Sequence, residues 1–144
     1  EALMNLPNEE VLLERNFDAQ STQLCTIRGI VREITESSGC SEACTELIVI
    51  AINEACMNII QHGYHSKPGG NIILEIRQSN DNLIIRLRDF ADPVEPSKVK
   101  PRDLEDLRPG GLGTHFIREA MDDIKFLPSP DGVGNLLQMV KRIT

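Results

Sequence analysis

Residues 46–65 read ELIVIAINEACMNIIQHGYH and decide the fold of this chain. The stretch is apolar on almost every side of a helix, which is typical of a helix buried inside a domain. Yet Glu54 and Asn58 sit in its middle, four residues apart and therefore on one face, with His62 about one turn further along. Because an unpaired buried carboxylate is costly, this polar stripe must face a pairing cation, a metal ion or solvent.

Two interpretations of the polar stripe follow from its residues. Glu54 and Asn58 could pair with an arginine or a backbone group elsewhere and only fix the packing of the helix. Alternatively, the Glu54 carboxylate could take a proton from a hydroxyl group, and the Asn58 amide oxygen is a suitable ligand for Mg²⁺. The stripe alone does not separate the two interpretations.

Length and composition predict one globular domain over residues 1–144. Hydrophobic residues make up 40% of the chain and charged residues 26%, which is ordinary for a globular protein. Fifteen basic residues against 22 acidic ones give a net charge of −7, and the absence of a basic cluster argues against nucleic acid as a partner. We expect no run of membrane-spanning length and no signal peptide, hence no contact with a membrane.

The cysteines favour a reducing compartment. Cys25, Cys40, Cys44 and Cys56 show neither a paired CxxC motif nor a histidine spacing typical of zinc sites. We therefore expect reduced thiols that act as small hydrophobic residues in a cytoplasmic protein. Since the first residue is Glu1 and not Met, a piece of a longer protein stays open as an interpretation.

Helices and strands alternate around the central helix. Asp18 is expected to cap a first helix that runs to about Ser38 and stops at Gly39, and Ser41 to cap the central one. Patterns of apolar residues predict strands over residues 9–17, 72–78, 83–89, 124–127 and 136–143. Together these elements predict a two-layer α/β sandwich, with a mixed but mainly antiparallel sheet and helices on one face.

A long segment from Phe90 to Pro109 separates two of the predicted strands. It is rich in proline and charge, and a loop of this length inside a compact domain is usually functional or disordered, so we expect a lid over about residues 90–110. The segment leads into Gly110-Gly111-Leu112-Gly113 and a predicted helix over residues 114–121. Glycines that open a helix expose backbone N–H groups to an anion, although a flexible hinge is the other interpretation.

The order of these motifs resembles the GHKL (Bergerat-fold) ATPases, whose fold is a histidine-kinase-like α/β sandwich. The resemblance covers about Val11 to Ile143. It rests on Asn53-Glu54-Ala55 with Asn58, on His62-Gly63-Tyr64, on Asp89 at a strand end and on Gly111-Leu112-Gly113. Within the superfamily the chain looks most like the anti-sigma factor serine/threonine kinases of bacteria.

The resemblance implies a role for each matching position. Glu54 would be the catalytic base, Asn58 the Mg²⁺ ligand, and Asp89 the acceptor of a hydrogen bond from the adenine amino group. Ala91 stands in the ATP site where the family commonly has glycine, so it adds a methyl group against the adenine pocket. The remaining ATP-binding positions would be His62 beside the nucleotide and Arg108, Gly111, Leu112, Gly113 and Thr114 at the phosphates.

The function that the resemblance implies is an ATP- and Mg²⁺-dependent serine/threonine protein kinase. It would phosphorylate a STAS-type anti-sigma antagonist and sequester a sigma factor, as a homodimer that regulates transcription in a stress response. A nucleotide-gated regulatory module without kinase activity is the alternative that Ala91 favours. The ATPase domain of a larger signalling protein is another, but a sensor histidine kinase would need a phosphoacceptor histidine on a separate dimerisation helix.

Overall fold

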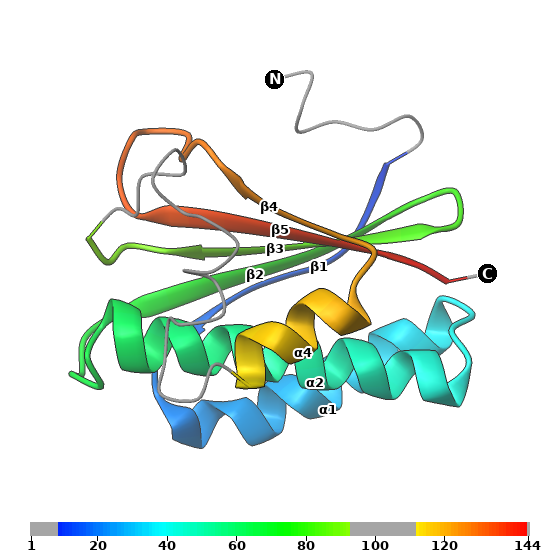
Figure 1. The fold of residues 1–144 in the computed structure, drawn as a ribbon, viewed down its shortest axis with the longest axis horizontal. Helices are drawn as coiled ribbons and strands as arrows, with labels where there is room; N and C mark the ends of the chain where they lie inside the picture. Colours follow the sequence, from blue (N-terminus) through cyan, green and yellow to red (C-terminus); the bar gives the residue numbers. More distant parts are fainter. Residues whose placement is uncertain (1–8, 93–111, 144) are drawn as a thin grey trace.

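The computed structural model describes residues 9–92 and 112–143, and of residues 112–115 it describes the backbone alone. The elements form two layers, with the helices on one side of a twisted sheet (Figure 1). In chain order they are β1 (Glu10–Asp18), the 3₁₀ turn η2 (Ser21–Gln23), α1 (Leu24–Ser37), α2 (Glu42–Asn58), the π-helix η3 (Ile59–Gly63), β2 (Asn71–Ser79), β3 (Asn82–Asp89), α4 (Leu112–Ala120), β4 (Asp123–Leu127) and β5 (Asn135–Arg142).

The sheet has the strand order β1-β2-β3-β5-β4. Each of the four pairings among the described strands is antiparallel, so the predicted mainly antiparallel sheet contains no parallel pair in this part of the chain. The two predicted hairpins are confirmed as β2–β3 and β4–β5. The turn of the first places Asn80 at a φ of 54°, a left-handed conformation that asparagine tolerates. The two-layer α/β sandwich is thereby confirmed.

The core lies between the sheet and the helices. Alternate residues of β2 and β3 point into it, and those of α2 meet them from the other side. Fully buried examples are Ile72, Leu74, Ile76, Leu83, Ile85 and Leu87 from the strands and Ile48, Val49, Ile52 and Cys56 from α2. Burying a side chain of this size stabilises a fold by about 1.5–3 kcal/mol, so the central helix holds the two layers together.

Together, α2 and η3 make one helical segment, Glu42–Gly63, that is long and apolar enough to cross a membrane by length and composition. The sequence interpretation that no such run exists was therefore wrong, because the apolar character continues through the π-helix. In the fold this segment packs on α1 and α4 and supplies a large share of the core (Figure 1). A buried core helix passes the same test as a membrane helix.

The predicted cap is confirmed at the start of α2 and is wrong at the start of α1. The Ser41 hydroxyl accepts a hydrogen bond from the Cys44 N–H at 3.1 Å and caps α2 as predicted. Asp18 does not cap α1, since it is the last residue of β1 and pairs there with Asn71. The 3₁₀ turn η2 intervenes, so α1 begins only at Leu24. Extended pairing with β2 competes with the cap and prevails.

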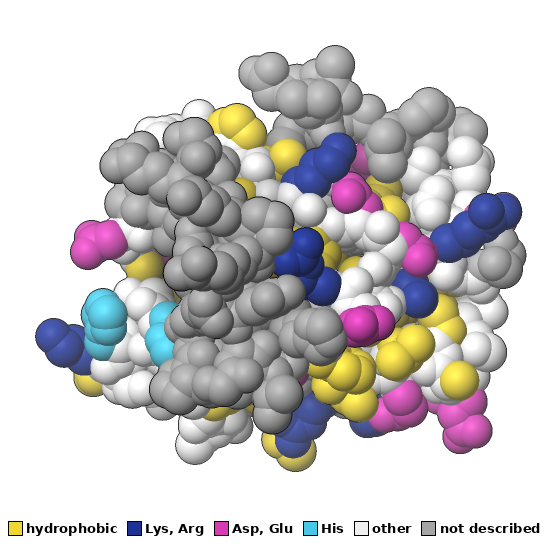
Figure 2. Space-filling view, in the orientation of Figure 1, with side chains coloured by type: hydrophobic (Ala, Val, Ile, Leu, Met, Phe, Trp, Pro, Cys, Tyr) yellow, Lys and Arg dark blue, Asp and Glu magenta, His cyan; other side chains and the backbone are white. Residues whose placement is uncertain are grey.

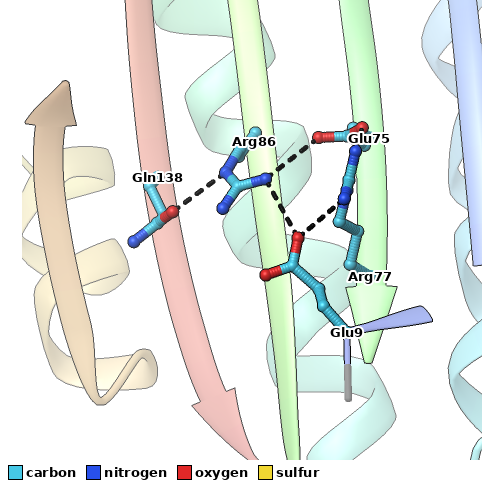
Figure 3. Close-up of polar contacts among 5 residues, drawn as sticks. All are labelled: Glu9, Glu75, Arg77, Arg86 and Gln138. Atoms are coloured by element: carbon cyan, nitrogen blue, oxygen red, sulfur yellow. Dashed lines mark hydrogen bonds and ion pairs between the residues drawn. The ribbon is translucent and has the colours of Figure 1, made fainter. Parts of the chain in front are cut away.

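The outer face of the sheet carries a network of charged side chains (Figure 3). Arg86 of β3 is 5% exposed, and its Nε donates to Gln138 Oε1 at 2.9 Å. Its NH1 group lies 3.4 Å from Glu9 and 3.3 Å from Glu75, and Arg77 also pairs with both carboxylates, at 2.8 and 2.7 Å. Two cations and two anions therefore balance across the strands.

Figure 2 shows acidic and basic side chains of the described residues mixed over the visible face of the molecule.

Removing Arg86 tests the network. We expect Arg86→Ala to lower the free energy of unfolding by about 2–4 kcal/mol, because it removes one of the two cations that Glu9 and Glu75 share and takes the buried donor from Gln138. The loss falls short of that for fully buried pairs, since Glu75 and Arg77 keep some contact with water. Urea unfolding measures the effect. Arg32→Ala is the matched control, because the Arg32–Glu46 pair is exposed, and an equal loss in both variants would contradict a special role for Arg86.

Candidate functional site

The polar stripe of the central helix lies near its carboxyl end. Glu54 and Asn58 are both half-buried on α2, one turn apart as predicted, and neither lacks a partner. An arginine does reach this part of the helix, but Arg28 of α1 donates to the neighbouring Asn53, with NH1 2.9 Å from Oδ1. That bond ties α1 to α2 beside the stripe, through a residue that is not one of the two predicted to carry chemistry.

The helix changes its winding directly after Asn58. Over Ile59–Gly63 it becomes a π-helix, and the Tyr64 N–H bonds the Ile59 carbonyl at 2.9 Å. Such turns are rare and occur often at functional sites. His62 lies in this turn, and its Nε2 is buried without a hydrogen-bond partner in the described part of the chain. An orphaned buried nitrogen of this kind suits a site that a ligand completes.

Asp89 ends β3 as a buried carboxylate, 5% exposed. Its Oδ1 accepts hydrogen bonds from the Ala91 N–H and from Asn135 Nδ2, both at 3.0 Å. Burial raises the pKa of Asp89 above its ordinary value, and these two hydrogen bonds oppose the shift. Because both bonds fall on Oδ1, within the described residues the second oxygen is left to accept from a ligand donor such as the adenine amino group.

Tyr64 joins the end of the central helix to two strands. Its hydroxyl donates to the Asn71 carbonyl at 2.8 Å and accepts from the Phe90 N–H at 2.7 Å. A Cβ built on Gly63 would lie 3.3 Å from the Ala91 Cβ, so these two positions are in close contact. The π-helix with His62 and the segment that follows Asp89 therefore lie side by side, although they are far apart in the sequence.

Three residues that hold this arrangement were missed by sequence reasoning. Asn135 lies opposite Asp89 in the β3–β5 register and donates to it. Gly134 has a φ of 75°, and a Cβ there would collide with the Asp89 carbonyl oxygen. Tyr64 was part of the quoted motif but had no assigned role. Of the three, Gly134 alone had a local signal, as a turn glycine just before a strand. Asn135 and Tyr64 act through long-range contacts.

The predicted phosphate site lies mostly beyond what the structure describes. Arg108, Gly111 and nearly all of the expected lid over about residues 90–110 are outside the described residues. Leu112, Gly113 and Thr114 form the first turn of α4 in the backbone, without described side chains. The amino-terminal end of a helix is a suitable place for an anion. A phosphate-binding role for these residues of α4 stays a prediction.

A two-layer sandwich with an antiparallel sheet, and a buried carboxylate at the end of β3 beside a π-wound helix end, is the arrangement expected of a nucleotide-binding domain of the histidine kinase-like class. Comparisons with known proteins agree. Residues 17–141 match the family model described as a histidine kinase-like ATPase domain.

The most similar relatives considered are serine-protein kinases. The chain is 32% identical over 123 residues to the serine-protein kinase RsbW of Bacillus mycoides, covering 80% of this chain and 76% of the relative. It is 31% identical over 100 residues to RsbW of Listeria innocua, covering 64% of each chain. The chain belongs to the histidine kinase-like ATPase family and, within it, to the RsbW group of serine-protein kinases.

A solved structure shows the same fold. The crystal structure of the RsbU and RsbW domains of a Mycobacterium tuberculosis protein superposes with a TM-score of 0.60 at 16% identity. The match covers 91% of this chain and 32% of that larger one.

Replacing Asp89 tests its role. Since the pKa of Asp89 is raised, its neutral form favours folding, and this contribution is lost as pH rises above the ordinary value of 3.8. Asp89→Asn cannot ionise, so we expect it to melt at a higher temperature than wild type at neutral pH, and to lose that advantage in acid. Adenine nucleotide binding should weaken by roughly 10- to 100-fold, because an amide donor would face the adenine amino group.

Thermal melts over a pH series and calorimetry with ADP measure the two effects. Asp131→Asn is the matched control, because it removes an exposed carboxylate that pairs with Arg88. A destabilised Asp89→Asn that binds ADP as wild type does would show that this carboxylate serves packing alone.

Proposed function

We propose that this chain is an ATP-dependent serine/threonine protein kinase that acts as an anti-sigma factor. The observation that carries the proposal is the buried Asp89 carboxylate, which Asn135 and the Ala91 N–H hold by one oxygen. A carboxylate kept in a low-dielectric position, with no neighbouring cation among the described residues, is expensive unless a ligand uses it. Membership of the RsbW group supports ATP as that ligand and protein phosphorylation as the reaction.

In this proposal Asp89 binds the adenine amino group, and His62 lies beside the nucleotide with its buried Nε2 toward it. Backbone N–H groups from Gly111 through Leu112 and Gly113 to Thr114 receive the phosphates, and Arg108 reaches the terminal one. These roles rest on the motif and on the helix start at Leu112.

The donor set on α2 fits a magnesium ion. Asn58 offers a hard amide oxygen that is half-buried on the face it shares with Glu54. When bound, Mg²⁺ neutralises charge on the phosphates of the nucleotide. Glu54 orients the serine or threonine hydroxyl of the protein substrate and takes its proton.

The partners belong to the same proposal. Membership of the RsbW group supports two protein partners. One is a sigma factor that the chain sequesters, and the other is a STAS-type antagonist that it phosphorylates. We further propose that the protein is a cytoplasmic homodimer and that it acts in a stress response, as the family resemblance implies.

Glu54→Gln tests the kinase, because it removes the base and keeps the shape of the side chain. We expect phosphate transfer from radiolabelled ATP to a STAS-type antagonist to fall by about 10²–10⁴-fold. ADP binding and the melting temperature should be unchanged, since the nucleotide is held by other residues. Glu46→Gln is the control, because Glu46 lies on the exposed side of the same helix and pairs with Arg32.

The outcomes separate the interpretations of Glu54. A stable variant that transfers phosphate at the wild-type rate would remove Glu54 from the mechanism. A poorly folded variant would favour the interpretation in which Glu54 only fixes packing.

A nucleotide-gated module without kinase activity is the second candidate, and Ala91 is the observation that favours it. Its Cβ lies in the contact with Gly63, next to the proposed adenine position. If the methyl group restricts the site, Ala91→Gly should raise ADP affinity and restore transfer. If Gly63 already accommodates it, both should stay at the wild-type level.

A further inference from the structure

Two cysteine thiols meet at the amino end of α2, far from the proposed nucleotide site. Cys40 directly precedes the cap residue Ser41, and Cys44 lies in the first turn of the helix. Their sulfur atoms are 3.7 Å apart, which is direct contact. The positions that sequence reasoning treated as unrelated hydrophobic residues therefore form a pair.

The backbone fixes both partners of the pair. The Ser41 hydroxyl accepts from the Cys44 N–H at 3.1 Å and sets the first turn of α2. The Cys40 N–H donates to the Thr35 carbonyl at 3.2 Å, after Gly39 has turned the chain at a φ of 99°. Because each cysteine is anchored on its own side of the cap, the contact between the sulfur atoms follows from the junction of α1 and α2.

The surroundings of the pair are polar as well as apolar. Burial and the neighbouring Cys44 raise the pKa of Cys40 to about 12, so Cys40 keeps its proton at neutral pH. Thr45 and Lys141 act in the opposite direction on that pKa. The Thr45 hydroxyl is fully buried and has no conventional hydrogen-bond partner in the described part of the chain. It is therefore available to interact with the sulfur atom of Cys40.

The two sulfur atoms have different surroundings. Cys44 is half-buried in the first turn of α2, and the thiolate form of a thiol is the nucleophile in disulfide exchange. Cys40 suits the second step of the exchange because its sulfur already touches that of Cys44, although it must give up its proton to attack. The other two cysteines lack such a neighbour among the described residues, since Cys25 is exposed on α1 and Cys56 is buried in the core.

We propose that Cys40 and Cys44 are a modification site, a dithiol that small-molecule disulfides oxidise reversibly to an intramolecular Cys40–Cys44 disulfide. The Cys44 thiolate attacks one sulfur of the small disulfide, whose S–S bond breaks and releases one thiol, which takes up the proton that Cys44 lost. Cys40 then attacks the mixed disulfide on Cys44, gives up its proton and releases the second thiol. Two protein thiols are oxidised and one small disulfide is reduced to two thiols.

The geometry suits a reversible bond. The sulfur atoms must approach from 3.7 Å to about 2.05 Å. Both cysteines are half-buried, so a small disulfide can reach them while bulk solvent is partly excluded. The ring spans few residues, so loop closure adds little stability to the disulfide, and an accessible disulfide of this kind is readily reduced.

Oxidised glutathione and thiol labelling test the proposal on the whole chain. The reduced protein is incubated with graded ratios of oxidised to reduced glutathione, denatured, and alkylated at every free thiol before mass measurement. We expect Cys40 and Cys44 to lose their labels together while Cys56 stays labelled, and the mass of the protein before alkylation to be lower by two hydrogens. Cleavage after Glu42 separates the two cysteines in sequence, so a disulfide must hold the two fragments together until it is reduced.

Variants make the test specific. Cys25→Ser should form the same disulfide, whereas Cys40→Ser and Cys44→Ser should lose it and carry glutathione on the remaining cysteine. Because the pair lies at the opposite end of α2 from Glu54 and Asn58, we expect ADP binding to be equal in the oxidised and reduced protein. The test thus stands apart from the proposed kinase function.

Three results would overturn the proposal. One is retention of both labels at ratios where the exposed Cys25 already carries glutathione. Another is a stable mixed disulfide on Cys40 or Cys44 that never closes the ring. The third is a disulfide between two chains that forms in place of the intramolecular one.

Discussion

Burial of α2 is the constraint on which the rest of the structure depends. The helix is apolar on most of its sides, and it reaches low exposure only because the sheet covers one side while α1 and α4 flank the others. Its few polar residues cannot be distributed freely, since each needs a partner or an opening. In its carboxyl-terminal half these are Asn53, Glu54 and Asn58, and with His62 of the following π-helix they lie on the part of the helical segment that approaches the end of β3.

The sheet must also bury apolar side chains, on the face that packs against α2. The inward residues of β2 and β3 are aliphatic until the chain reaches Asp89, where the alternation puts a carboxylate in an inward position. Gly134 lets the backbone of the neighbouring strand approach closely, and Asn135 then reaches the carboxylate. Within the described residues, amide donors and not a cation thus support a buried carboxylate at the edge of the core, which suits recognition of a donor on a ligand.

Much of the fold was predictable because periodicity and turn chemistry are local. Alternation in residues 72–78 and 83–89 fixed the hairpin, and Ser41 gave the start of α2. The cap at Asp18 was wrong because pairing with Asn71, a residue more than fifty positions away, extends β1 through it. The π-winding after Asn58 leaves no mark in an apolar pattern, so its effect on His62 could not be foreseen.

The site was predictable only where a motif marks it. Glu54, Asn58, His62 and Asp89 were singled out by the order of their motifs, and their roles stay predictions, whereas Asn135 and Tyr64 act through contacts that no local pattern encodes. The pair of sulfur atoms at Cys40 and Cys44 escaped for a related reason. A spacing of four across a helix start brings side chains together only when the cap residue sets the turn, and that geometry is seen in the fold.

Ala91 stands where the family commonly has glycine, and the effect of this difference depends on the neighbouring Gly63. A Cβ on Gly63 would approach the Ala91 Cβ to 3.3 Å, closer than ordinary contact, so only one of the two positions can carry a methyl group without displacement. This chain carries it at 91, and the missing side chain at 63 leaves space for it against the π-helix. Part of the added volume is therefore accommodated by the helix and need not project toward the nucleotide. Ala91 in place of glycine thus does not by itself argue against ATP binding, and the measured effect of Ala91→Gly decides between the kinase and the nucleotide-gated module.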